Sequence, residues 1–447
     1  MIGQRIAEEV LQEAKRKGAT EADLALVQNE LVTVQVRFGE VETIRSAKEV
    51  GLGLRLFFGK RSATSSTSDL SRESLDRLVE DTVVLAKATA HDEFSGLPSP
   101  EELAKRFPEL DLYDPEGETL TVKERITQAK EAEAAALAYD SRITNSEGAD
   151  FSSNLYRIIY GSSQGFVGEY RGTTFSLAVT PIALSNGAMQ RDYWYSFTRH
   201  LKDLESPEAI GRQAAERTVR RLGGKKIKTQ EVPVVFDPET AASLMRTLCS
   251  AASGPSLYRG ASFLIDRLGD RIAAEIVSVH DDGTMPGHLG SKPFDGEGLP
   301  TRRTAVMENG VLRSYLLDTY SARKLKLVPT GSAVRGIGDV PTVGPTNFYL
   351  QAGPHDPADI IQSVDRGLYV TEMIGSGVNL VTGDYSRGAV GFWIEKGELA
   401  YPVEEITVAG NFKEMMLGIE MVGNDLTFRN SVVAPTLKIR RMTVAGH

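Results

Sequence analysis

Histidines are the first place to look for chemistry, because metal and acid/base sites are usually built from them. The chain has six, and no two stand in the H-x-x-x-H or H-E-x-x-H spacing that places two ligands on one helical face. His280 and His288 flank the string HDDGTMPGH, which also holds Asp281 and Asp282. These four side chains offer a metal two imidazoles and two carboxylates. Because DDGT is a common turn, a surface turn is the favoured interpretation.

Candidate nucleophiles are few. Cys249 lies in LMRTLCSAAS, where an apolar helix is expected and no neighbour in sequence would lower the thiol pKa, so we expect a buried structural thiol. Ser321 and Lys324 form an S-x-x-K string that would place a serine/lysine pair on one helical face, and the same string is typical of an ordinary helix start. No G-x-S-x-G or G-x-x-x-x-G-K-[ST] motif occurs.

Polar residues also cluster among glycines in three places, at 293–298, 383–388 and 423–425. Such loops are able to line a substrate path or a protein interface. The alternative is a set of β-turns in which Asp and Asn side chains bond their own backbone. The candidate residues from the two later loops are Asp384, Tyr385, Ser386, Arg387, Asn424 and Asp425.

Composition limits the class of protein. A net charge of −9 gives no electrostatic reason to bind nucleic acid directly. A single cysteine rules out an intrachain disulfide and fits a reducing compartment. The N-terminal segment is charged at helical spacing without the apolar core of a signal peptide, and no apolar run is long enough to span a membrane. We therefore expect a cytoplasmic protein with no membrane partner.

The elements that must position these residues follow from periodicity. Helical spacing predicts helices over 3–17, 69–88, 121–139, 206–222 and 238–252. Alternating apolar residues predict strands over 22–27, 31–38, 41–46 and 50–58, and a glycine-punctuated meander over 143–197. Short strands between Gly/Pro turns dominate the rest of the chain.

This pattern predicts an α+β fold of two domains. Residues 1–225 would form layers of helices on antiparallel sheet, with a linker near 92–118, and residues 229–447 a β-rich domain resembling a barrel or a sandwich. Helix, strands and helix occur twice in the first part, as two related layers or as one interleaved domain.

Several strings then resemble a known family. GDYSRG at 383–388, GFWIE at 391–395 and GND at 423–425 are similar to the C-terminal signature of the TldD/TldE (PmbA) peptidases. Earlier strings agree, and the resemblance covers essentially the whole chain, closer to the TldE/PmbA branch. Those strings are RITN at 142–145, RDY at 191–193, SFL at 262–264, PFD at 293–295 and SARKL at 321–325.

The resemblance implies a cytoplasmic heterodimer in which TldD carries a zinc on a His-Glu-x-x-x-His helix and a C-terminal cysteine. The family is associated with trimming a microcin precursor and degrading unfolded or antitoxin peptides. The corresponding helix here, about 243–253, reads SLMRTLCSAAS and has no His or Glu. The stretch after Asp425, LTFRNSVVAPTL, has no Cys. A catalytic zinc needs about three protein ligands, so no catalytic or metal-binding residue is assigned.

The leading hypothesis is therefore a non-catalytic subunit of a TldD/TldE-type zinc metallopeptidase. It would bind no cofactor itself, its TldD-like partner would carry the zinc, and the pair would act on peptide substrates. Two alternatives stay open. One is a peptide-binding or regulatory homodimer, and the other a hydrolase that uses Ser321 with Lys324, or Cys249.

Overall fold

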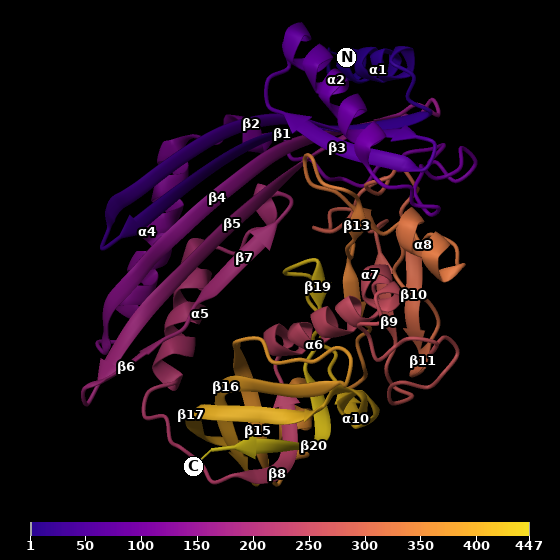
Figure 1. The fold of residues 1–447 in the computed structure, drawn as a ribbon. Helices are drawn as coiled ribbons and strands as arrows, with labels where there is room; N and C mark the ends of the chain where they lie inside the picture. The colour runs from indigo at the N-terminus through magenta and orange to yellow at the C-terminus, as the bar shows by residue number, and fades with distance from the viewer. Residues whose placement is uncertain (1, 447) are drawn as a thin grey trace.

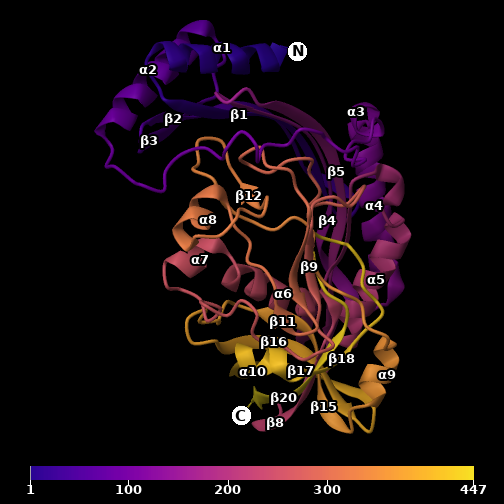
Figure 2. The same cartoon turned by 90° about the vertical axis from the view of Figure 1, so that its right-hand side faces the viewer.

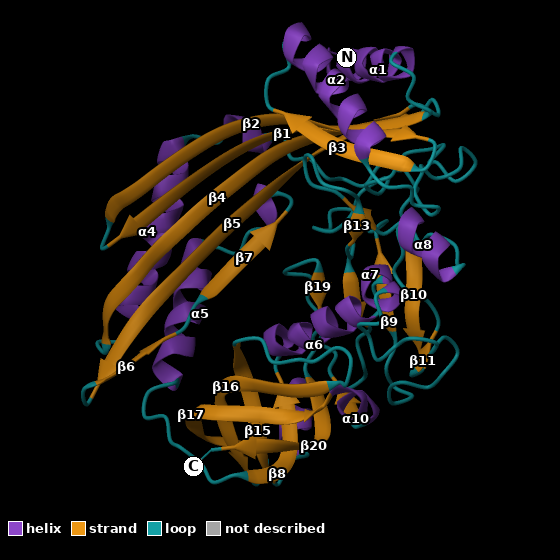
Figure 3. Cartoon of the chain, viewed as in Figure 1, coloured by secondary structure: helices purple, strands orange, loops and turns teal. Residues whose placement is uncertain are grey.

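The computed structural model describes residues 2–446 and has the α+β architecture that the sequence predicts. A long curved sheet with helices on its outer side forms the N-terminal half (Figure 1). The C-terminal half combines a small closed barrel with a second mixed sheet (Figure 3). Among the described residues, no helix is both long enough and apolar enough to cross a bilayer.

The N-terminal sheet has seven strands in the order β3-β2-β1-β4-β5-β6, and β7 pairs with β5. Neighbouring strands are antiparallel, and β1 pairs with β4 along most of its length. The two helix–strand units therefore share one continuous sheet, which curves into a half-barrel. Its strands are β1 (Glu21–Arg37), β2 (Glu40–Phe58), β3 (Arg61–Thr67), β4 (Ile143–Ser162), β5 (Val167–Ser185), β6 (Ala188–Arg191) and β7 (Trp194–Thr198).

These strands are longer than the sequence suggested, since β1 and β2 each join two predicted strands and most of the expected meander is β4 and β5. Only Gly165 of the glycines at 161–172 turns the chain, with φ +87°. Gly168 and Gly172 lie inside β5. A Cβ at Gly168 would sit 2.6 Å from the Phe294 ring, and a Cβ at Gly172 would sit 2.4 Å from the Tyr156 hydroxyl, so neither position has room for a side chain. They allow close packing on the sheet, and the sequence prediction mistook them for turns.

Helices cover the convex face of the half-barrel, and the C-terminal half lies against the concave face (Figure 2). The two N-terminal helices pack on Leu24, Leu52 and Ile159, and two later helices pack on Val34 and Phe151. The helices of this half are α1 (Ile2–Arg16), α2 (Arg72–Ala88), α3 (Glu116–Thr119), α4 (Val122–Tyr139) and α5 (Pro207–Arg220). Polar side chains cap the first turns of three of them: Ser71 caps α2, Thr121 and Glu124 form a capping box on α4, and Ser206 caps α5. A 3₁₀ turn, Leu201–Asp203, precedes α5.

The C-terminal barrel closes because β17 pairs with both β16 and β20, in the order β17-β16-β15-β8-β20-β18. This confirms the barrel-like prediction. Its strands are β8 (Gln230–Phe236), β15 (Arg366–Ile374), β16 (Asp384–Glu395), β17 (Glu398–Asn411), β18 (Ile419–Val422) and β20 (Leu437–Ala445). Closure leaves the barrel strands few free hydrogen-bonding edges.

A second sheet in the order β11-β10-β9-β14-β19 stands beside the barrel, and α6 (Pro238–Ala251) lies between the two. The strands of that sheet are β9 (Val279–Asp282), β10 (Arg303–Glu308), β11 (Val311–Leu312), β14 (Phe348–Leu350) and β19 (Val432–Val433). The remaining elements are α7 (Gly254–Tyr258), α8 (Thr319–Leu325), β12 (Ala333–Val334), β13 (Thr342–Val343), α9 (Pro357–Gln362) and α10 (Phe412–Leu417).

The stretch between α2 and α3, which contains most of the predicted linker near 92–118, runs along the junction of the two halves. Its backbone is bonded to both, because the Ala104 N–H donates to Gly298 O at 2.9 Å and the Thr173 N–H donates to Leu112 O at 2.9 Å. The segment therefore joins the sheet to the C-terminal half.

A buried ionic network also joins the halves. Asp23 on β1 is fully buried and pairs with Arg55 on β2 at 2.6 Å and with Arg335 of the C-terminal half at 3.0 Å. The Tyr160 hydroxyl on β4 donates to Asp23 at 3.0 Å, and Glu297 lies 3.5 Å from Arg55. Burial alone would raise the pKa of Asp23, but the two guanidinium groups outweigh it and hold that pKa below its ordinary value.

Neutralising Asp23 should destabilise the whole chain. In Asp23→Asn two buried guanidinium groups lose their shared anion, so the free energy of unfolding should fall by about 3–5 kcal/mol in urea titrations. The matched control is Glu30→Gln, which breaks the exposed Lys48–Glu30 pair at 2.8 Å and should cost under about 1 kcal/mol. Equal losses in the two variants would contradict a special role for the buried network.

Candidate functional site

The helix α6 occupies the place where the resemblance puts the metal ligands of a sister subunit. Asp237 caps it, since its carboxylate accepts the Thr240 N–H at 2.8 Å, and Pro238 follows at the first helical position. One side of the helix, including Leu244, Met245 and Leu248, is buried in the C-terminal core. This burial fixes which side of α6 faces outward.

The outward side carries Ser243, Arg246, Thr247 and Ser250, all partly or fully exposed. The three hydroxyls donate to backbone carbonyls one turn earlier in the same helix, at 2.6–3.1 Å. Arg246 is therefore the ionisable group that this side presents. No residue here is a ligand that zinc prefers.

A second buried ionic network holds the start of α6 against the N-terminal half. Arg217 on α5 lies 3.3 Å from Asp192 and 3.9 Å from Asp237, and Arg221 pairs with Asp192 at 3.5 Å and with Glu372 on β15 at 2.7 Å. Of these residues the sequence pointed only to Asp192, as part of the RDY string at 191–193. Arginines in the last turn of an amphipathic helix normally face solvent, and no signal in the string AERTVRRL shows that Arg217 and Arg221 are buried.

This environment shifts the titration of Asp237. Burial is the largest cause and raises the pKa of its carboxyl to about 6, although hydrogen bonds from Thr240 and the charge of Arg217 act in the opposite direction.

The predicted loop at 383–388 is the beginning of β16, and most of its side chains are engaged locally. Asp384 is exposed and accepts the Thr382 hydroxyl at 2.7 Å, as expected for a turn residue. Arg387 donates through Nε to Gly375 O at 2.9 Å, and Ser386 is exposed. Tyr385 differs, because it is 2% exposed and its hydroxyl lacks a hydrogen-bond partner within residues 2–446.

Burial raises the pKa of Tyr385 to about 12, and Ser243 of α6 is one of the groups close enough to influence it. Tyr385 is thus the member of the predicted loop that faces the candidate helix. The proximity of Tyr385 to Ser243 therefore brings the predicted loop next to α6.

The other two polar loops connect elements of the C-terminal half. Asn424 is exposed, and Asp425 accepts the Thr436 N–H at 2.9 Å and its hydroxyl at 2.7 Å. In the loop at 293–298, Asp295 accepts three backbone N–H groups at 2.9–3.0 Å. Asp295 bonds the backbone of its own turn, as in the turn interpretation, and also the Ala333 N–H, whereas Asp425 joins its loop to Thr436, eleven residues further along the chain.

Neither candidate nucleophile has catalytic surroundings. Cys249 is buried as predicted, and burial, followed by the charge of Asp281, raises its pKa far above the ordinary value. Ser321 is 0% exposed and bonds Asp318 in a capping box. The ammonium of Lys324 lies 4.5 Å from the centre of the Phe94 ring. Ser321 and Lys324 therefore do not form the dyad that the S-x-x-K spacing allowed.

The histidine string begins in β9, which holds His280, Asp281 and Asp282, and His288 lies beyond the strand. The surface-turn interpretation was wrong for the three residues in β9, because all of them are buried. His280 is 6% exposed and its Nε2 is 3.3 Å from Gln351, whereas His288 packs edge-on against Phe428 with ring centres 4.7 Å apart. Burial lowers the pKa of His280. Over residues 2–446, no group of three or more His, Cys, Asp or Glu side chains is placed to hold a metal ion.

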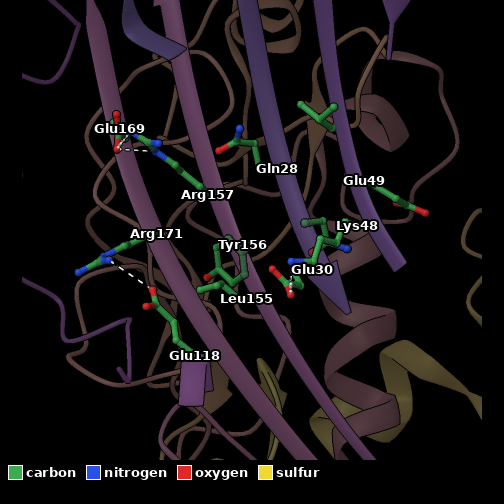
Figure 4. Close-up of a pocket in the computed structure, with 12 residues that line it drawn as sticks. Gln28, Glu30, Lys48, Glu49, Glu118, Leu155, Tyr156, Arg157, Glu169 and Arg171 are labelled. Carbon is green, nitrogen blue, oxygen red and sulfur yellow. Dashed lines mark hydrogen bonds and ion pairs between the residues drawn. The ribbon is translucent and has the colours of Figure 1, made fainter. Parts of the chain in front are cut away.

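A hollow of about 640 Å³ lies on the N-terminal sheet, lined by side chains of β1, β2, β4 and β5 and by Glu118 of α3 (Figure 4). Most of its charged side chains are paired with one another. The pairs are Arg157–Glu169 at 2.6 Å, Lys48–Glu30 at 2.8 Å and Arg171–Glu118 at 3.9 Å. The hollow therefore presents little unpaired charge to a ligand. For this reason we place the candidate functional site at α6 and not in the hollow.

Three family models match the chain in order. They describe PmbA/TldA metallopeptidase domain 1 at residues 22–86, the central domain at 115–222 and the C-terminal domain at 229–446. The metalloprotease PmbA of Escherichia coli O157:H7 is 38% identical over 425 residues, which cover 95% of this chain and 92% of that protein.

Solved structures agree in fold. A Bacteroides thetaiotaomicron protein described as a candidate modulator of DNA gyrase superimposes with a TM-score of 0.92 at 29% identity, covering 99% of this chain and 98% of that one. TldE from Thermococcus kodakarensis has the same fold, with a TM-score of 0.89 at 22% identity over 99% of this chain and 100% of that one.

The raised pKa of Asp237 predicts a pH dependence of stability. The folded value, about 6, exceeds the ordinary 3.8, so the carboxyl contributes stability that is complete below about pH 4 and is lost as the pH rises through about 6. Asparagine keeps the helix cap and removes this titration. The free energy of unfolding of wild type, relative to Asp237→Asn, should therefore fall by about 2 kcal/mol from pH 4 to pH 7 in urea titrations.

The matched control is Asp140→Asn. Hydrogen bonds from Arg142 lower the pKa of exposed Asp140 to about 2, so its titration lies below this pH window and the variant should show no comparable slope. Parallel curves for wild type and Asp237→Asn would contradict the assignment.

Proposed function

Because the chain belongs to the PmbA/TldA metallopeptidase family, we propose that it is a non-catalytic subunit of a cytoplasmic zinc peptidase, paired with a TldD-like member of the family. The observation that carries the proposal is the outward face of α6. At the place expected to hold zinc ligands, this face presents hydroxyls bonded to their own helix and one arginine. These residues do not fit a zinc ion, so no step of a metal-dependent reaction is assigned to this chain.

The proposed role of the chain is to hold the peptide and to enclose the site. In Figure 1, α6 lies between the barrel and the second sheet, with the half-barrel on the other side of the molecule, and the buried ionic networks join the two halves. An enclosed space admits unfolded chains and excludes folded ones, which suits the trimming of unfolded peptides such as microcin precursors or antitoxins. Arg246 would then attract a carboxylate or a main-chain carbonyl of the peptide.

The hydrolase alternative loses support in this geometry, since Ser321 is a helix-capping residue and Cys249 is a buried thiol. A peptide-binding or regulatory homodimer uses the same surface without a zinc subunit. A partner-dependent assay separates it from the proposal.

Reconstitution is the direct test of the proposed role. This chain alone should not cleave a casein-like or unfolded peptide substrate, and addition of the TldD-like subunit should produce cleavage that a zinc chelator abolishes. Chelator-resistant cleavage by this chain alone would refute the proposal. Peptide binding without any gain of activity on mixing would favour the homodimer.

The contribution of α6 is tested with Arg246→Ala in the reconstituted enzyme. Loss of a charge-assisted contact to the peptide should lower kcat/KM about tenfold while the two subunits still co-purify. The control is Arg212→Ala, which removes an exposed arginine paired with Glu208 on the convex side and should leave kcat/KM unchanged. Equal kcat/KM for the Arg246 variant and wild type would remove this residue from the peptide path.

A further inference from the structure

One edge of the half-barrel is open along much of β2. β3 pairs with β2 only from Leu52 to Phe58, whereas β1 pairs with β2 along its full length. Among the described strands, none covers the outer edge of β2 before Leu52, and β2 forms the rim of the sheet there (Figure 1). The segment is also exposed on both faces, including Ile44 at 50%. Long free edges are templates for pairing with another strand.

The regular part of this edge has defined ends. On one side the pairing with β1 shifts register between Gln35 and Val36, which leaves Glu42 as the extra residue. On the other side β3 begins to pair at Leu52. The straight free edge therefore runs from Thr43 to Gly51, and its central residue is Ala47.

We propose that this edge pairs antiparallel with the same edge of a second copy of the chain, around a two-fold axis at Ala47. A symmetric interface uses one surface twice, so the segment must complement its own reversed sequence. With the axis at Ala47, Arg45 of each copy lies opposite Glu49 of the other copy, and Ile44 of each copy lies opposite Val50 of the other copy. Opposite charges and paired β-branched side chains are both favourable cross-strand contacts.

The side-chain faces agree with this register. Residues directly opposite in an antiparallel pair lie on the same face of the sheet, and Arg45 and Glu49 lie on the face of Gly51, where a Cβ would meet Ile337 of the C-terminal half. Arg45 and Glu49 are both exposed, and neither has an ion pair within the described chain. Each is thus free to pair with the other copy.

The same charges disfavour the neighbouring register. An axis at Arg45 would set that residue against itself, and like charges directly opposite are destabilising. The small side chain of Ala47 also suits the axis, where two identical side chains meet. The charge pattern therefore favours an alignment centred on Ala47 over alignments centred on Arg45 or Glu49.

This interface is separate from the proposed peptide site, because it uses the rim of the sheet and not α6. It goes beyond the proposed function and does not depend on it. A second copy joined here would extend two half-barrels into one continuous sheet.

Charge reversal tests the proposal by sedimentation of the full chain over a range of concentrations. Arg45→Glu sets four carboxylates at the junction and Glu49→Arg sets four guanidinium groups there, so each variant alone should dimerise at least about tenfold more weakly than wild type. An equal mixture of the two variants should dimerise again, because every facing pair is then of opposite charge. Arg77→Glu on the exposed side of α2 changes the net charge equally and should have no effect.

A cysteine probe tests the axis without altering charge. Ala47→Cys should form an intermolecular disulfide under mild oxidation because position 47 faces itself, whereas Thr43→Cys should not because position 43 faces position 51. The natural Cys249 is buried and does not compete. A wild-type chain that stays monomeric at every concentration, variants that dimerise as wild type does, or equal cross-linking at 43 and 47 would each overturn the proposal.

Discussion

The ion pair between Asp23 and two arginines is the constraint on which the arrangement of the molecule depends. Asp23 is fully buried, Arg55 comes from the next strand, and Arg335 comes from the opposite half of the chain. Because a buried charge without its partner is strongly destabilising, the curved sheet and the C-terminal half can meet in very few ways. The glycines beside the network have the same role, since a Cβ at Gly53 would lie 2.5 Å from the Gly338 nitrogen.

The sequence predicted the five long helices well, missed most of the short ones and predicted the strands only in part. Helices carry local signals, such as the capping box of Thr121 and Glu124 or the cap of Ser206 followed by Pro207, and these signals do not depend on the rest of the fold. Glycines within β5 carried a misleading signal, because close packing and turns both favour glycine. Only contacts with Phe294 and Tyr156, distant in sequence, distinguish the two roles.

The candidate site shows the same limit. The predicted loop at 383–388 contains Tyr385, which lies near Ser243 of α6, but Asp384 bonds its own turn and Asp425 bonds Thr436 in another segment. The groups that hold the start of α6 in place, Arg217 and Asp192, come from distant parts of the chain and become neighbours only through folding. A sequence gives residue types and local spacing, whereas buried ionic networks depend on contacts between distant segments.

The central claim is that the chain supports a zinc peptidase without binding the metal. Native mass spectrometry of the co-expressed complex with the TldD-like subunit tests this most directly. We predict a complex that holds the two chains in equal number and one zinc ion for each TldD-like subunit, and the zinc should stay with that subunit when the complex is dissociated in the gas phase. Zinc retained by this chain, or failure of the two chains to associate, would contradict it.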